Sequence, residues 1–160
     1  MAAHDFRLVA TNCGYVAAGA TGGALLRYGV SEYGKRRGQG PAAIMAINII
    51  GSFLLGGITG ALPGTQAALL MGTGFCGAFT TFSTYSVDVV NLARAGQILP
   101  AAGLALSSNI LSVGAAAAGL SLGASPVVTR ALASRPALRR LSSPIPPPRP
   151  KSPPSQHPAQ

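Results

Sequence analysis

Apolar residues in this chain gather into four long stretches, which are separated by short polar segments. The stretches lie at about residues 8–26, 42–62, 67–90 and 98–124. Each comes close to, or exceeds, the roughly 20 apolar residues that an α-helix needs to cross a bilayer. A tight turn is expected at Pro63–Gly64, and longer connections at Ser31–Pro41 and Asn91–Gln97. The pattern predicts an all-α membrane protein with four transmembrane helices.

The third stretch is unusual, because its segment Gly74–Ser86 reads GFCGAFTTFSTYS. Glycines precede a run of hydroxyl residues: Thr80, Thr81, Ser83, Thr84 and Ser86. Threonine and glycine both weaken a helix interior, and broken helices at membrane depth are often ion or substrate sites. We therefore expect the third helix to be broken here. The alternative is a continuous helix whose hydroxyls bond back to its own carbonyls.

Composition supports the membrane assignment and divides the chain. Charged residues make up 9% of the chain and hydrophobic residues 48%, against roughly 25% charged residues in a soluble domain. We expect an N-terminal tail at residues 1–7, a four-helix domain at 8–125 and a disordered Pro/Arg-rich tail at 126–160. The net charge of +9 comes mainly from one connection and this tail, so it indicates membrane-flanking charge rather than nucleic-acid binding.

Small residues at four-residue spacing predict close helix packing at Gly19 and Gly23 and at Gly56 and Gly60. The fourth stretch also carries Ser108 and Ser112 on one helix face, which indicates either interhelical bonding or a pore wall.

Two further polar residues are candidates for a site. Asn48 lies about two turns into the second stretch, and a buried amide must face protein or water. It is expected either to bond to another helix or to line a path. Arg27 follows the first stretch, where it either reaches the membrane interface or faces anions in a vestibule.

The acidic residues exclude some classes of protein. They are Asp5, Glu32 and Asp88, and none is expected deep in the membrane. A small four-span proton-coupled transporter normally needs such a carboxylate, so this class remains only as an alternative. The spans also lack a His–carboxylate pair or a nucleophile–base set, which argues against an enzyme.

Basic residues are divided almost evenly between the two sides of a four-span arrangement. One side carries Arg7, Arg130, Arg135, Arg139 and Arg140, followed by the more distant Arg149 and Lys151. The other carries Arg27, Lys35, Arg36, Arg37 and Arg94. Because the Lys/Arg bias sets orientation, this sequence barely specifies which way it inserts.

Four segments together resemble the Fluc (CrcB-type) fluoride channels. They are GATGGALLRY, NIIGSFLLG, GFCGAFTTFSTYS and the serine-bearing face of the fourth stretch, and they cover about residues 15–123. The resemblance implies an antiparallel, dual-topology dimer with two pores in a prokaryotic-type cell membrane. It also implies passive export of fluoride from the cytoplasm, which reduces fluoride toxicity.

The resemblance also assigns residues. Backbone carbonyls of Gly77 and Thr80 would hold a central structural sodium ion, and oxygen is the right donor for such a hard cation. Asn48 corresponds to the pore asparagine of the family, and Phe82 and Tyr85 correspond to its two pore aromatics. The hydroxyls of Ser83, Thr84, Ser108 and Ser112 would form a track of donors for fluoride.

Two positions depart from the family pattern. The second aromatic is usually phenylalanine, but here it is Tyr85, whose hydroxyl would either donate to the ion or obstruct the path. Leu104 stands where the family often has tyrosine. The expected partners are fluoride, membrane lipid and a second subunit, in either a homodimer or a heterodimer with a paralogous subunit. A subunit that conducts only with a partner, or not at all, remains the alternative.

Overall fold

The computed structural model describes residues 2–134 and residue 145. Its elements are α1 (Ala2–Arg36), α2 (Gly40–Ala61), the π-helix η1 (Ala68–Cys76), α3 (Gly77–Phe79), α4 (Phe82–Arg94), α5 (Ile98–Gly123) and α6 (Pro126–Ala133). Every one of these elements is helical, so the all-α prediction is confirmed for the part of the chain that the structure describes.

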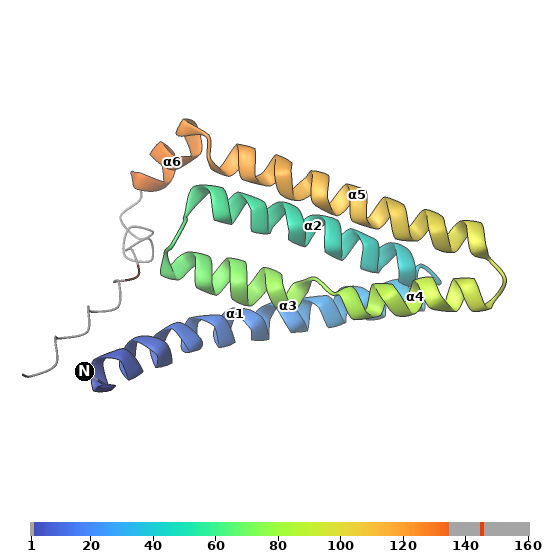
Figure 1. Ribbon diagram of the computed structural model, residues 1–160, viewed down its shortest axis with the longest axis horizontal. Coiled ribbons are helices and arrows are strands. Elements are labelled where there is room, and N and C mark those ends of the chain that lie inside the picture. Colours follow the sequence, from blue (N-terminus) through green and yellow to red (C-terminus); the bar gives the residue numbers. More distant parts are fainter. Residues whose placement is uncertain (1, 135–144, 146–160) are drawn as a thin grey trace, which may run out of the picture.

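The helices run back and forth along the long axis of the molecule (Figure 1). The turns after α1 and α4 lie at one end, and the start of α1, the turn after α2 and α6 lie at the other. Gly38 and Gly64 make turns with φ of 69° and 68°, a conformation that costs other residues energy. The predicted turn at Pro63–Gly64 is confirmed.

Three predicted boundaries are wrong. The tail expected at residues 1–7 is part of α1 from Ala2 onward, and α1 continues to Arg36 through much of the first predicted connection. An ion pair of 3.2 Å between Glu32 and Arg36, one turn apart, supports that extension. Helix α4 likewise continues to Arg94.

The predicted disorder after residue 125 is also wrong in part. Ser125 is followed by helix α6, which has a proline in its first turn, where proline is well tolerated. Residues 135–144 and 146–160 of the predicted tail lie outside the described residues.

Two of the described helices, α2 and α5, are long and apolar enough to cross a membrane. They match the second and fourth predicted stretches within two residues at each end.

Close packing holds the helices in pairs. Helix α2 packs along α5, and α1 packs along η1 and α3. A Cβ added at Gly56 would overlap the Ala116 carbonyl oxygen, and one at Gly23 would overlap that of Phe75. Gly19 and Gly60 meet neighbouring backbone in the same way, so both predicted glycine packing faces are confirmed. This packing places the junction of α3 and α4 against α2.

Candidate functional site

The backbone is extended at two residues between α3 and α4. Thr80 has φ −75° and ψ 157°, and Thr81 has φ −150° and ψ 125°. Thr81 then caps α4, because its Oγ1 accepts a hydrogen bond from the Thr84 N–H at 3.3 Å. The interruption lies near the middle of the segment from η1 to α4 (Figure 1), within the threonine run that the sequence singled out.

Asn48 on α2 bonds to both backbone groups of Thr81. The Thr81 N–H donates to Asn48 Oδ1 at 2.8 Å, and Asn48 Nδ2 donates to the Thr81 carbonyl at 3.0 Å. Asn48 Oδ1 therefore replaces the Gly77 carbonyl as the acceptor that the Thr81 N–H would have in a continuous helix, and a backbone group in lipid must have such a partner. Nδ2 carries two N–H groups, so one donor remains after this pairing.

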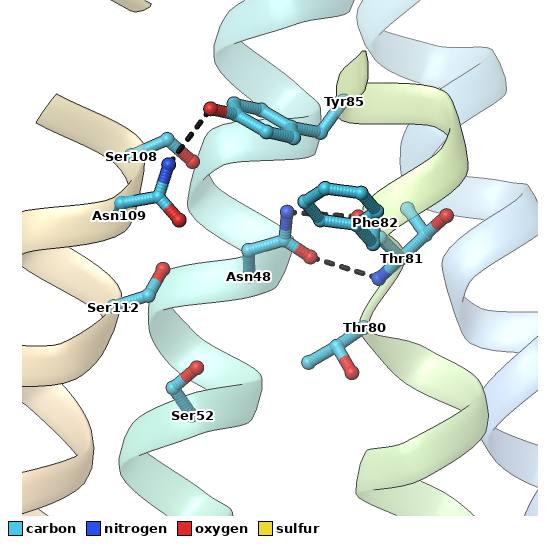
Figure 2. Close-up of a pocket in the computed structure, with 9 residues that line it drawn as sticks. All are labelled: Asn48, Ser52, Thr80, Thr81, Phe82, Tyr85, Ser108, Asn109 and Ser112. Carbon is cyan, nitrogen blue, oxygen red and sulfur yellow. Dashed lines mark hydrogen bonds between the residues drawn. The ribbon is translucent and has the colours of Figure 1, made fainter. Parts of the chain in front are cut away.

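A cavity of about 200 Å³ opens beside this pairing (Figure 2). Its lining residues are Asn48, Ser52, Thr80, Thr81, Phe82, Tyr85, Ser108, Asn109 and Ser112. Of the predicted pore residues, the cavity brings together five: Asn48, Phe82, Tyr85, Ser108 and Ser112. Ser112 Oγ is buried and has no hydrogen-bond partner within the described chain. The lining is uncharged and offers hydroxyl and amide donors.

The two predicted aromatics lie side by side at this cavity. Their ring centroids are 5.7 Å apart and the rings are tilted by 48°. Phe82 is 76% exposed, whereas Tyr85 is 8% exposed. The Tyr85 hydroxyl donates to the Ala105 carbonyl at 3.0 Å, so its hydrogen is directed into α5. Leu104 packs against the apolar cluster that contains Tyr85.

A second cavity of about 360 Å³ contains the remaining predicted side chains. It is lined by Ala24, Arg27, Tyr28, Ser31, Lys35, Ser83 and Thr84. Arg27 therefore lies with Ser83 and Thr84, on a different side of α4 from the first cavity. Thr80 and Ser86 bond back to carbonyls four residues earlier, at 3.0 and 2.8 Å. The alternative of back-bonded hydroxyls thus applies to these two residues.

The carbonyls of Gly77 and Thr80 have lost the donors that an uninterrupted helix would supply. In such a helix they would accept from residues 81 and 84. The Thr81 N–H instead donates to Asn48, and the Thr84 N–H donates to the Thr81 hydroxyl. No cluster of three His, Cys, Asp or Glu side chains occurs in the described chain. A cation bound by the described residues would therefore depend on oxygen donors such as these carbonyls.

Sequence reasoning missed several lining residues. Ser52 lies one turn after Asn48, and this spacing could have placed it on the same face. Asn109 lies three positions before Ser112, and residues at this spacing share a helix face, so it too could have been placed at the cavity. Lys35 was assigned to a connection, but the extension of α1 carries it into the second cavity.

Comparison with known proteins identifies the family. The family model described as CrcB-like protein, Camphor Resistance (CrcB), matches residues 14–120, more than half of the chain.

The chain belongs to the CrcB-like family.

Curated relatives agree with this assignment. The chain is 45% identical over 109 residues to "Fluoride-specific ion channel FluC 1" of Halobacterium salinarum, covering 64% of this chain and 85% of the relative. It is 44% identical over 108 residues to "Fluoride-specific ion channel FluC 2" of a Synechococcus species, covering 68% of this chain and 76% of the relative. The resemblance is therefore confirmed. This CrcB-like chain is a membrane protein of an ion-channel family, and not an enzyme.

Proposed function

We propose that this CrcB-like protein is a fluoride channel of the cell membrane, through which fluoride leaves the cytoplasm down its gradient. Such export would lower fluoride toxicity. The observation that carries the proposal is the cavity at the interruption, whose polar lining consists of hydroxyl and amide groups without an acidic side chain. The name "Fluoride-specific ion channel" of its relatives supports the choice of ion.

The donor chemistry suits a small, strongly hydrated anion. Fluoride loses water on entering a narrow path, so donors must replace that water at each step. Ser108, Ser112 and the remaining N–H of Asn48 supply such donors, and the ring edges of Phe82 and Tyr85 carry partial positive charge. No lining group is suited to proton coupling, which favours passive movement. The hydroxyls of Ser83 and Thr84 would extend this series of donors into the second cavity. There Arg27 would raise the local anion concentration.

The interruption also bears on how the chain would be arranged in the membrane. We propose that α1, α2, the segment from η1 to α4, and α5 each cross the bilayer, and that two subunits pack antiparallel. Phe82 and Gly77 are exposed on the subunit surface beside extended backbone, and backbone without partners is costly in lipid. A second subunit would cover it, and the even Lys/Arg balance allows both orientations.

A structural sodium ion at this interface is part of the proposal. The carbonyls of Gly77 and Thr80 fit this role, because their helical donors are engaged elsewhere. Two carbonyls from each of two subunits would provide four oxygen ligands. The bound ion would place a fixed positive charge between the subunits and stabilise their association.

A non-conducting or partner-dependent subunit is the second candidate. The observation that favours it is Leu104, an apolar side chain packed against the Tyr85 cluster where the family often has a tyrosine. In that case the chain would pair with a paralogous subunit.

One experiment separates the two candidates. The purified chain alone is reconstituted into potassium-loaded liposomes, and fluoride efflux is followed with a fluoride electrode after a potassium ionophore is added. We expect rapid fluoride efflux, with chloride retained. Efflux no faster than from protein-free liposomes would contradict the channel proposal for this chain alone. Recovery of efflux on mixing with a paralogous subunit would then establish the second candidate.

A further inference from the structure

The hydroxyl of Tyr85 belongs to a closed group of three hydrogen bonds. It donates to the Ala105 carbonyl at 3.0 Å and accepts from Asn109 Nδ2 at 2.8 Å. Asn109 Nδ2 also donates to the same carbonyl at 2.7 Å. A carbonyl oxygen only accepts hydrogen bonds, so the Asn109 atom beside it must be the nitrogen. The amide orientation is therefore determined by its partners.

These bonds use the single hydrogen of the Tyr85 hydroxyl, which is the group that could bind an anion. Its single hydrogen points at Ala105, and Asn109 occupies a lone pair, so the group has no hydrogen to donate into the cavity. The ring is held at its tip by α5 and at its base by α4, beside Phe82 (Figure 2). A tyrosine restrained in this way presents to the cavity the ring edge that a phenylalanine would present.

A released hydroxyl would act differently. Fluoride is a strong hydrogen-bond acceptor, and bonds to charged groups are among the stronger ones in proteins. A phenolic hydrogen free to turn into the cavity would hold the ion, and a channel must bind weakly enough to let its ion leave. The oxygen would also occupy space in the path between the aromatic rings.

We propose that Asn109 is a positioning residue, which keeps the Tyr85 hydroxyl bonded to α5 and out of the ion path. On this basis the Asn109–Tyr85 pair is what makes a tyrosine compatible with transport at a position where the family usually has phenylalanine. The proposal rests on the proposed fluoride-channel function, and it concerns how this chain accommodates its own departure from the family.

The test is a set of variants in the liposome efflux assay: Asn109→Ala, Tyr85→Phe, and the two combined. We expect Asn109→Ala to slow fluoride efflux by about tenfold, which corresponds to about 1.4 kcal/mol, the order of one net hydrogen bond. Tyr85→Phe is the reference for the double variant, because it leaves no hydroxyl to restrain. The double variant should recover to the level of Tyr85→Phe, which a merely structural role of Asn109 would not produce.

Asn91→Ala is the matched control, because Asn91 lies on α4, the helix that carries Tyr85, but lines a different cavity, with Val87 and Arg94. It should conduct like the parent. If Asn109→Ala conducts like the parent, or if the double variant stays as slow as Asn109→Ala, the proposal is wrong. Should Asn109→Ala not assemble, Asn109→Gln, which displaces the amide by one methylene, serves in its place with the same two outcomes. A parent chain without fluoride efflux would instead contradict the channel function itself.

Discussion

Asn48 and Thr81 are joined by a reciprocal pair of hydrogen bonds, although they lie 33 residues apart in the sequence. The amide accepts from the Thr81 N–H and donates to the Thr81 carbonyl, at 2.8 and 3.0 Å. Thr81 is only 6% exposed, so water cannot substitute for these bonds. Asn48 thus bonds to the interrupted backbone and also lines the cavity. The sequence left open whether it bonds to another segment or lines a path, and the two roles need separate tests.

The first prediction concerns the charge tolerance of the cavity. Asn48→Asp should abolish fluoride efflux, because a fixed negative charge repels the ion. The same change also removes the hydrogen bond that Asn48 Nδ2 donates to the Thr81 carbonyl, and one such bond contributes about 0.5–1.5 kcal/mol. Loss of efflux in this variant alone would therefore fit either a pore role or a structural one.

Ser52→Asp provides the matched comparison. Ser52 lines the same cavity one turn away and takes no part in the pairing with Thr81. We expect Ser52→Asp to abolish efflux while the thermal unfolding midpoint stays near that of the parent, whereas Asn48→Asp should lower both. Normal efflux through Ser52→Asp would mean that this cavity is not the fluoride path.

The second prediction concerns the basic cavity beside α4. Arg27→Ala should slow fluoride efflux more at low than at high ionic strength, because attraction of anions is screened within about 10 Å at 0.1 M salt. Lys35→Ala should act in the same direction, since Lys35 lines the same cavity. Arg94→Ala is the control, because Arg94 lines another cavity. An equal loss at both salt concentrations would indicate a structural role for Arg27.

The two extended residues, Thr80 and Thr81, lie within the run that the sequence singled out, so the signal for them is local. Threonines and glycines disfavour the helix within the segment itself, and Asn48 stood out as an amide in an apolar stretch. The extent of α1 was not predictable in the same way. Its polar end was interpreted as a connection, but α1 continues through it to Arg36, because no proline interrupts it before the turn at Gly38.

Partners of the site residues were the least predictable feature. The Tyr85 hydroxyl finds Asn109, 24 residues away on another helix. That encounter depends on the rotation of α5 about its own axis, which packing against α2 determines. Similarly, Ser83 and Thr84 are separated from Ser108 and Ser112 on α5 because they occupy a different face of α4 from Phe82 and Tyr85, which line the first cavity with those serines. Sequence spacing could group these hydroxyls by type but not by cavity.

The third prediction concerns assembly through the exposed face of α3. A Cβ added at Gly77 meets nothing within 4 Å in the subunit, and the backbone there is helical. Gly77→Ala should therefore not harm the isolated subunit. In an antiparallel dimer that holds sodium at this carbonyl, however, the methyl group would crowd the partner. We expect weaker dimerisation on size-exclusion chromatography in detergent.

Sodium dependence completes that test. Replacing sodium by N-methyl-D-glucamine during purification should shift the parent toward monomer or inactive dimer, because an ion bound only by the assembled form stabilises it by mass action. Assembly and efflux that are unaffected by sodium would count against the site. Unchanged assembly of Gly77→Ala would place the subunit interface elsewhere.

The fourth prediction tests the packing that holds the cavity walls together. Gly119 on α5 faces α2 so closely that an added Cβ would overlap the Phe53 carbonyl oxygen, whereas Gly114 on the same helix has nothing within 4 Å. Replacing glycine by alanine favours a helix by about 1 kcal/mol, but overpacking costs about 1–3 kcal/mol. Gly119→Ala should therefore lower the thermal unfolding midpoint and slow fluoride efflux, since α2 and α5 both carry residues that line the cavity. Gly114→Ala should leave both unchanged or raise the midpoint. If the two variants behave alike, the close α2–α5 contact does not determine the shape of the cavity.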